Sequence, residues 1–325
     1  MSIRNKAFDI GLLNTKTFDI PVIAVGNLNV GGTGKSPMIE YLIRLFNKSN
    51  HTAVLSRGYG RKTKGFLLAT NGCTAVDLGD EPFQFFRKFK NVDIAVDEKR
   101  VRGIEKLQEL KPDLDLVLLD DAFQHRYVKA GKYILLTAFD QLYMDDFMLP
   151  TGSLREPRKG AKRADWIVVS KCPTNLSDAK QKEIRNRISP GEHQKVFFSS
   201  IEYDKYIYSS DRKMALDELK GYKILLITGI AKPEPLLEFL EKNELEIEHM
   251  RYSDHEFINE DQQKIISSSF ANLEGENKLI LTTEKDYVRS FLAITPPVYY
   301  LPIKMQLLEE EQKFNEIITN YVRKN

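Results

Sequence analysis

The chain has 325 residues, 42% of them hydrophobic, and this length allows two hydrophobic cores because single cores rarely grow beyond about 250–300 residues. Its 48 Lys and Arg residues nearly balance its 46 Asp and Glu residues, and the net charge of +2 argues against a general nucleic-acid-binding protein. The two cysteines, Cys73 and Cys172, are too few for a disulfide framework or a zinc site, which indicates a reducing, cytosolic compartment.

The first half of the chain alternates strand and helix patterns. Phe18–Val25 is an apolar, β-branched run, and a Gly-rich turn separates it from a helix expected over Pro37–Asn47. Further strands are expected at Thr52–Leu55, Phe66–Ala69, Val92–Val96, Leu114–Leu119, Ile134–Thr137 and Trp166–Val169, and helices at Glu81–Phe89 and Arg100–Leu110. Buried strands that alternate with amphipathic helices predict a doubly wound, mostly parallel α/β sheet.

The second half begins with a long loop, predicted from Leu149 to Ala164, and loops of this length are usually functional or disordered. After a helix expected at Asn175–Ile188, the extended pieces Lys195–Tyr203 and Tyr206–Ser209 suggest a ribbon between domains. A second βα series is then expected at Ile224–Thr228, Glu234–Asn243, Ile247–Tyr252, Asp261–Leu273 and Leu279–Thr282. We therefore expect two domains, residues 1–196 and the smaller residues 197–325, which includes the ribbon.

The Gly-rich turn predicts a phosphate-binding loop, made by Asn29, Val30, Gly31, Gly32, Thr33, Gly34, Lys35 and Ser36. Backbone amides of such a turn surround phosphate oxygens, the lysine reaches the β- and γ-phosphates, and the serine hydroxyl coordinates Mg²⁺. The usual pattern has glycine where this chain has Asn29, a residue that also tolerates left-handed geometry. A Gly-rich turn with an incidental lysine is the alternative, and the strand before it and helix after it disfavour that interpretation.

Two carboxylates, Asp120 and Asp121, follow the predicted strand Leu114–Leu119. In phosphate-loop proteins an acid at this place holds Mg²⁺, usually through water, so we predict a metal role, although strand ends often carry turn acids. Which carboxylate lies nearer the metal stays open. His125 follows closely and starts near the site, although a loop histidine is more often structural.

Three other acidic stretches are explained locally by helix capping. Asp80 fits an N-cap position ahead of Glu81, and Ser253–Glu256 and Thr283–Asp286 fit capping boxes. Local chemistry alone assigns none of them to catalysis.

Seven stretches occur together between about Asn14 and Tyr287, and they are Pro21–Leu28, the phosphate loop, Ser56–Arg61, Gly79–Pro82, Asp120–His125, Leu149–Pro157 and Thr282–Asp286. In this order they resemble the tetraacyldisaccharide 4'-kinase family. A single motif is weak evidence, whereas the ordered set is specific. In that family the first loop position is also commonly not glycine, which fits Asn29, while Ala122 stands where the family usually has glycine.

The resemblance implies ATP-dependent phosphorylation of the 4'-hydroxyl of a tetraacylated glucosamine disaccharide 1-phosphate, which gives lipid IVA in lipid A biosynthesis. It implies a larger P-loop NTPase-like domain and a smaller α/β domain joined by a two-stranded β-ribbon, with the site in the cleft. ATP and Mg²⁺ are the implied cofactors, and the eight loop residues from Asn29 to Ser36 are the implied nucleotide-binding residues.

The resemblance also assigns roles to individual residues. Asp80 resembles the general base, His255 from the second domain resembles its partner, and Lys35 completes the catalytic set. Four residues match the metal site, namely Ser36, Glu81, Asp120 and Asp121. Five residues match positions that line the substrate site, namely Arg57, Arg100, Arg155, Glu156 and His125. Arginines suit the substrate's 1-phosphate and the developing γ-phosphate charge, and a solvated basic face is the alternative for Arg100.

The implied location is the cytoplasmic face of the bacterial inner membrane, as a peripheral protein at the bilayer surface. No segment approaches the roughly 18 apolar residues of a membrane span, so the chain is expected to be soluble by its own sequence. Family members usually begin with an apolar helix before an Arg-Asn stretch, which here is already Arg4-Asn5. An acylated substrate still requires access to the bilayer, whereas no nucleic-acid or protein partner is implied.

Two alternative functions remain. A phosphate-loop kinase of another small molecule predicts a polar acceptor site without an exposed apolar groove. A nucleotide-dependent switch or GTPase usually carries an Asn/Thr-Lys-x-Asp run, and the comparable place reads Ser170-Lys171-Cys172-Pro173, without the acid.

Overall fold

The computed structural model describes residues 2–254, 256–292 and 298–324. The chain forms two compact units, one made of Met1–Glu202 with Lys304–Asn325 and the other of Tyr203–Ile303. Among the described residues, no helix combines the length and apolar character needed to cross a membrane.

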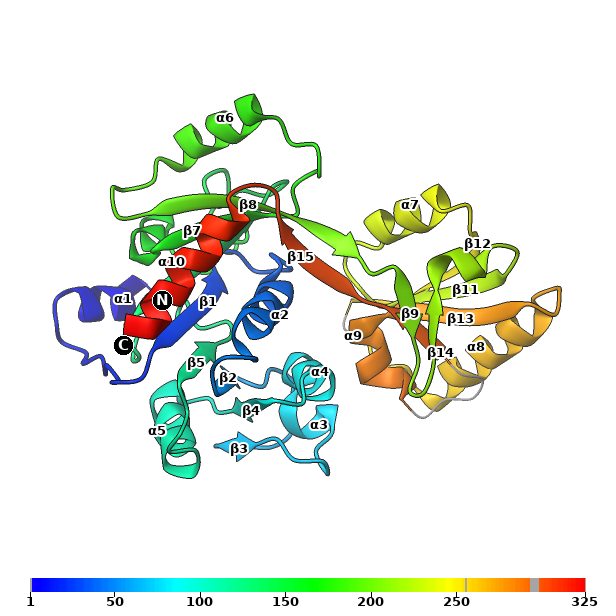
Figure 1. Cartoon of the computed structure of the whole chain (residues 1–325), viewed down its shortest axis with the longest axis horizontal. Helices are drawn as coiled ribbons and strands as arrows, with labels where there is room; N and C mark the ends of the chain where they lie inside the picture. Colours follow the sequence, from blue (N-terminus) through cyan, green and yellow to red (C-terminus); the bar gives the residue numbers. More distant parts are fainter. Residues whose placement is uncertain (1, 255, 293–297, 325) are drawn as a thin grey trace. The chain divides into compact units, whose positions relative to one another are not determined.

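The larger unit is built on a nine-stranded sheet in the part of the chain that the structure describes (Figure 1). Its order is β15-β8-β7-β6-β1-β5-β2-β4-β3, and the pairs from β8 to β4 are parallel, while β3 is antiparallel to β4. The strands are β1 Val22–Asn27, β2 Thr52–Ser56, β3 Leu67–Leu68, β4 Val92–Val96, β5 Leu116–Leu119, β6 Lys132–Ala138, β7 Trp166–Ser170, β8 Lys195–Tyr203 and β15 Ile303–Leu307. The expected mostly parallel, P-loop NTPase-like sheet is confirmed.

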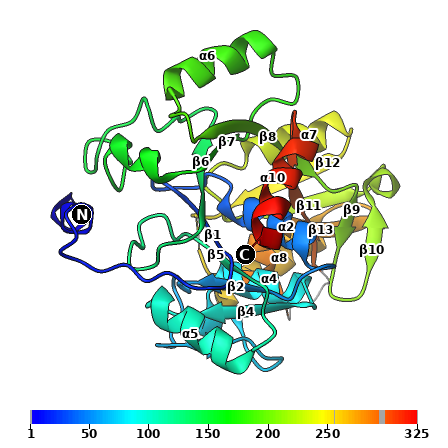
Figure 2. The ribbon, with the colours of Figure 1, turned by 60° about the vertical axis from the view of Figure 1, so that its left-hand side comes forward.

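Helices cover both faces of this sheet (Figure 2). The helices packed in these cores are α2 Lys35–Phe46, α4 Asp80–Lys88, α5 Arg100–Leu110, α6 Asp178–Ile188, α10 Glu311–Lys324 and the 3₁₀ helix η1 Arg158–Arg163. The described part of this unit also contains α1 Ser2–Asp9 and α3 Ala75–Leu78. The apolar residues of α2 recur at helical spacing, so one stripe is buried in the same core as α4 and α10. The other face of the sheet packs against α5 and, farther along the sheet, against α6. This double winding leaves the carboxyl ends of β1 and β5 free for a site.

The expected domain division, 1–196 and 197–325, is wrong for residues 197–202 and for the last 22 residues, Lys304–Asn325, because both segments belong to the larger unit. Phe314, Ile318 and Val322 recur every four residues along α10 and are buried in the core that contains α2. Tyr41 of α2 meets the ring of Phe314 at 6.0 Å, and Figure 2 shows the two helices side by side. The tail therefore completes the first core after the chain has built the second.

The smaller unit carries a six-stranded sheet among the described residues, in the order β10-β9-β14-β13-β11-β12. Its strands are β9 Tyr206–Tyr208, β10 Lys213–Ala215, β11 Lys223–Thr228, β12 Glu246–Arg251, β13 Lys278–Thr283 and β14 Val298–Leu301, with helices α7 Glu234–Lys242, α8 Glu260–Asn272 and α9 Glu284–Asp286, the 3₁₀ helix η2 Leu216–Leu219 and the π-helix η3 Tyr287–Phe291. The connecting ribbon is not formed by Lys195–Tyr203 and Tyr206–Ser209, the two segments expected to pair. β8 pairs with β15, where the Leu308 amide donates to the Phe198 carbonyl at 3.0 Å, and β9 instead pairs with β10 and β14.

Candidate active site

The predicted phosphate loop lies between the end of β1 and the start of α2. Lys35 is the first residue of α2, so the helix amino terminus points its free amides and partial positive charge at the loop. The Lys35 Nζ atom lies 3.5 Å from Asn27 Oδ1 and 3.8 Å from Asp121 Oδ1. Its ammonium group is therefore held over the loop, where a phosphate would meet it.

Asp120, at the end of β5, is buried and lies in a group of acids. Its Oδ2 accepts a hydrogen bond from the Ser56 hydroxyl at 2.6 Å, while Oδ1 is buried without a hydrogen-bond partner. Burial, followed by the nearby charge of Glu81, raises the pKa of Asp120 to about 7. The Ser36 hydroxyl donates to Glu81 Oε1 at 2.8 Å, which brings the phosphate loop to the same group of acids.

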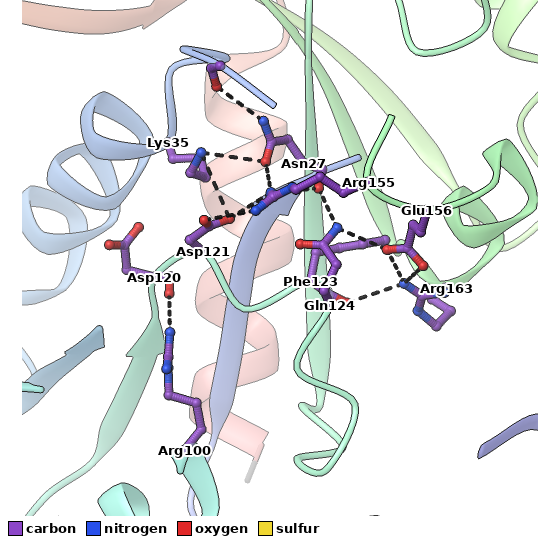
Figure 3. Close-up of polar contacts among 11 residues, drawn as sticks. Asn27, Lys35, Arg100, Asp120, Asp121, Phe123, Gln124, Arg155, Glu156 and Arg163 are labelled. Atoms are coloured by element: carbon purple, nitrogen blue, oxygen red, sulfur yellow. Dashed lines mark hydrogen bonds and ion pairs between the residues drawn. The ribbon is translucent and has the colours of Figure 1, made fainter. Parts of the chain in front are cut away.

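Asp121 is held in a different way. It has a φ of 45°, a left-handed backbone that is uncommon for a residue other than glycine and is often found at functional sites. Arg155 donates to both carboxylate oxygens, at 3.1 Å and 2.9 Å. Burial alone raises the pKa of Asp121, but Lys35 and then Arg155 outweigh it and lower the pKa. Figure 3 shows the carboxylate between these two cations.

The acids and the serine fit a magnesium site. Among the described residues, no three or more His, Cys, Asp and Glu side chains are grouped so that they would hold a metal alone. Mg²⁺ is usually bound by one or two carboxylates together with water and substrate phosphates, so a complete protein cage is not required. The unpartnered Asp120 Oδ1, the Ser36 hydroxyl and Glu81 supply hard oxygen ligands of the kind that Mg²⁺ prefers.

A tight backbone contact fixes the start of α4, where Asp80 stands next to Glu81. Asp80 is the first residue of α4, half-buried, and directly precedes Glu81. Gly79 before it has a φ of 89°, and a Cβ there would lie 2.7 Å from the Tyr59 carbonyl oxygen, so only glycine fits. This contact joins the Ser56–Arg61 and Gly79–Pro82 motifs. The predicted partner, His255, lies outside the described residues.

Buried Arg100 and partly buried His125 contact each other next to Asp120. The Arg100 guanidinium donates to the carbonyls of Asp97 and Asp120 at 2.9 Å and 3.3 Å, and its backbone amide donates to His125 Nε2 at 3.3 Å. Burial lowers the pKa of Arg100 to about 10. Burial, and then the charge of Arg100, lowers the pKa of His125 to about 4, so this imidazole is neutral near pH 7. Arg57, at the end of β2, is exposed.

Glu156 is fully buried, with 0% exposure, and its oxygens are occupied by protein groups. Asn5 donates to it at 3.1 Å. Gln124 donates to it at 3.0 Å, and Arg163 donates to both oxygens at 2.8 Å and 2.9 Å (Figure 3). Gln124 also donates to the Asn27 carbonyl at 2.7 Å. These contacts tie α1 and η1 to the end of β1, and the sequence motifs gave no functional interpretation for Asn5, Asn27, Gln124 or Arg163.

The strand order, the phosphate loop and the acids at the end of β5 define a P-loop NTPase-like α/β protein. A family model described as tetraacyldisaccharide-1-P 4'-kinase matches residues 1–323, and the chain belongs to this family of kinases. The expected family and enzyme class are thereby confirmed.

Relatives and a solved structure agree with this assignment. Proteins named tetraacyldisaccharide 4'-kinase from Flavobacterium johnsoniae and Bacteroides thetaiotaomicron are 50% and 44% identical, over 100% of this chain and 94% and 90% of their own lengths. The crystal structure of LpxK from Aquifex aeolicus, solved in complex with ATP, matches with a TM-score of 0.77 and 28% identity, covering 99% of this chain and 94% of that chain.

Proposed function

We propose that this chain transfers the γ-phosphoryl group of ATP to the 4'-hydroxyl of tetraacyldisaccharide 1-phosphate, giving lipid IVA. The observation that carries the proposal is the meeting of Lys35 and Ser36 with the acids at the end of β5, within a chain of this kinase family. In the reaction the bond between the γ-phosphorus and the β–γ bridging oxygen breaks, and a bond from the sugar oxygen to phosphorus forms. ADP leaves, and the hydroxyl proton goes to the protein.

The phosphate loop positions the triphosphate. Backbone amides of the loop from Asn29 to Ser36, apart from the Val30 amide that donates to Ser153, surround its oxygens, and the amino terminus of α2 adds partial positive charge. Lys35 neutralises charge on the β- and γ-phosphates. Its contacts with Asn27 and Asp121 already hold the ammonium group next to the loop. Because phosphoryl transfer needs mainly positioning and charge neutralisation, these contacts account for much of the rate.

Mg²⁺ would be held by Ser36, Glu81, Asp120 and Asp121. When bound, the ion would supply positive charge that neutralises the charge developing on the phosphate oxygens. The protein's part is to keep the Asp120 Oδ1 oxygen unpartnered and to hold Ser36 against Glu81.

Asp80 is the proposed general base that accepts the proton of the 4'-hydroxyl. Its place beside Glu81 supports this role, because the acceptor oxygen must approach the γ-phosphate next to the metal-binding acids. His255 is proposed as its partner on the grounds of family resemblance.

The arginines are proposed to recognise phosphate groups. Arg155 and Arg57 are at least partly accessible, and a guanidinium can bind a phosphate through two parallel hydrogen bonds. Arg100 and neutral His125 lie behind Asp120 and add positive charge and shape to this side of the site. Glu156, being buried, serves the site by holding Gln124 and Arg163.

The acylated substrate places the reaction at a bilayer surface. We propose that the protein works peripherally on the cytoplasmic face of the inner membrane, where the polar disaccharide can enter the site while the acyl chains stay in lipid. Neither nucleic acid nor a protein partner is needed for this chemistry.

The decisive experiment measures transfer of ³²P from labelled ATP, with Mg²⁺, to detergent-dispersed tetraacyldisaccharide 1-phosphate. We expect label in a bisphosphorylated lipid. A chain that hydrolyses ATP but labels only a polar acceptor would instead be a kinase of another small molecule. A preference for GTP over ATP without any labelled acceptor would indicate a nucleotide-dependent switch.

A further inference from the structure

Asn29, the first residue of the phosphate loop, has a buried side chain that another loop holds. Only 1% of Asn29 is exposed, and its Nδ2 donates to Asp146 Oδ2 at 2.6 Å and to the Ser153 hydroxyl at 3.3 Å. A glycine at this place would have no side chain for such contacts. The asparagine therefore does more than tolerate the backbone of the turn.

Asp146 is the centre of this contact. Its Oδ1 accepts from the backbone amides of Phe147 and Ser153 at 2.7 Å and 3.0 Å, and its Oδ2 accepts from the Ser153 hydroxyl as well as from Asn29. Although partial burial acts to raise it, these donors lower the pKa of Asp146 to about 2, so the carboxylate is ionised at any physiological pH. Gly152 lies against Asp146 and Phe147 so closely that a Cβ there would overlap both residues.

The same loop then runs along the first residues of the phosphate loop. The Val30 amide donates to the Ser153 carbonyl, and the Arg155 amide donates to the Leu28 carbonyl, both at 2.7 Å. Asn29 and Leu154 are paired as an antiparallel bridge. Two residues beyond Ser153, the Arg155 side chain bonds Asp121 and the Asn27 carbonyl. One short segment thus touches the phosphate loop, the end of β1 and the acid that faces Lys35.

We propose that Asp146 is a positioning residue for the proposed phosphoryl transfer: by holding Asn29, it fixes the phosphate loop relative to Arg155 and Asp121. Two backbone hydrogen bonds alone allow the loop to hinge about the bridge, and the ionised side-chain contact removes that freedom. The role rests on the proposed function, because its benefit is the alignment of phosphates with Lys35 and Arg155.

The test exchanges the two side chains. Asp146→Asn alone is not diagnostic, because the Asn29 amide can rotate and offer its oxygen to the new Nδ2. Asn29→Asp puts two carboxylates 2.6 Å apart and breaks the contact. Asn29→Asp combined with Asp146→Asn restores one donor and one acceptor with the polarity reversed, and the amide oxygen introduced at position 146 still accepts from Phe147 and Ser153. Asp145→Asn is the matched control, because the neighbouring Asp145 pairs with Arg187 at the surface.

We expect Asn29→Asp to lower kcat by about 10- to 100-fold, while the KM for the lipid stays unchanged. The double variant should recover most of the lost kcat, and Asp145→Asn should match the wild type. Circular dichroism and thermal unfolding establish that each variant is folded. A double variant as slow as Asn29→Asp, or an Asn29→Asp variant with wild-type kcat, would overturn the proposal. A second measurement separates this proposal from the proposed function. If the wild type itself labels no lipid, the proposed function fails, but the affinity of the same variants for Mg-ATP still tests the positioning role. Only Asn29→Asp should then bind Mg-ATP more weakly than the wild type.

Discussion

At the scale of single residues, two adjacent acids of the site have pKa values shifted in opposite directions by their surroundings. Asp120 is buried near the charge of Glu81 and has a raised pKa, whereas Asp121 faces Lys35 and Arg155 and has a lowered pKa. The Asp121 carboxylate is therefore already paired with two cations of the protein, whereas the Asp120 Oδ1 oxygen is buried without a hydrogen-bond partner. The two neighbouring carboxylates thus differ in pKa because burial and Glu81 dominate at Asp120, whereas Lys35 and Arg155 outweigh burial at Asp121.

Replacing Lys35 by alanine should lower kcat by about 100- to 1000-fold, because one charge that stabilises the transferring phosphate is lost. Steady-state kinetics with the lipid acceptor measure the effect. The midpoint of thermal unfolding should change little, because Lys35 is only weakly held, at 3.5 Å from Asn27 and 3.8 Å from Asp121. Unchanged turnover would remove Lys35 from the reaction.

Replacing Asp80 by asparagine keeps the shape of the side chain but removes its basicity. We expect kcat to fall by about 100- to 10,000-fold, the usual range for a general base. Asp77→Asn is the matched control, because Asp77 caps the neighbouring helix α3 through Thr74 and takes no proposed part in the reaction. Equal rates for the two variants would show that Asp80 is only a helix-capping residue.

At the scale of elements, motifs that sit where a strand meets a helix could be predicted from sequence, and contacts between distant loops could not. The phosphate loop and the acids after β5 are contiguous in the chain, so their residue types and order indicate the chemistry. The contact between Asn29 and Asp146 joins residues 117 positions apart and leaves no local pattern. The pairing of the ribbon could not be predicted for the same reason, since β8 pairs with a strand about 100 residues later.

His51 supplies an element-scale test at the opposite end of the sheet. It precedes β2, and its ring contacts Asp93 of β4 at 2.7 Å and Asp113 before β5 at 3.0 Å. Lys111 also pairs with Asp93, and the Asp115 carboxylate accepts from the His51 amide. Partial burial opposes protonation of the ring, but the hydrogen bonds to the two carboxylates outweigh it and raise the pKa of His51 above its usual 6.5.

A raised folded-state pKa means that the protonated ring stabilises the fold fully below about pH 6.5, and that this stabilisation is lost as pH rises through the folded-state value. His51→Asn should therefore lower the thermal midpoint more at pH 6 than at pH 9. The exposed His193, replaced in the same way, serves as the control. Equal losses at both pH values would show that the two ion pairs do not depend on protonation of His51.

At the scale of the whole molecule, the chain completes its first core last. β8 leads out of the larger unit, residues 203–303 form the smaller unit, and β15 and α10 return. A division into two successive domains follows naturally from the order of βα patterns. The return of the tail is not predictable in this way, because the amphipathic pattern of α10 shows that the helix must bury a stripe but not against which core.

A substitution of Phe314 in α10 tests how much the stability of the larger unit depends on the C-terminal segment, β15 and α10. Its ring is fully buried and meets Phe197 at 4.8 Å and Trp166 at 6.4 Å, in edge-to-face arrangements with strands β8 and β7. Phe314→Ala removes these contacts and leaves a cavity, so we expect the larger unit to lose about 3–5 kcal/mol of unfolding free energy. Denaturant unfolding followed by the fluorescence of Trp166, the single tryptophan, reports on that unit alone. Asn320→Ala, on the exposed side of the same helix, should change it by less than about 0.5 kcal/mol. A comparable small loss for Phe314→Ala would mean that the first core is complete without α10, and that the units are successive domains after all.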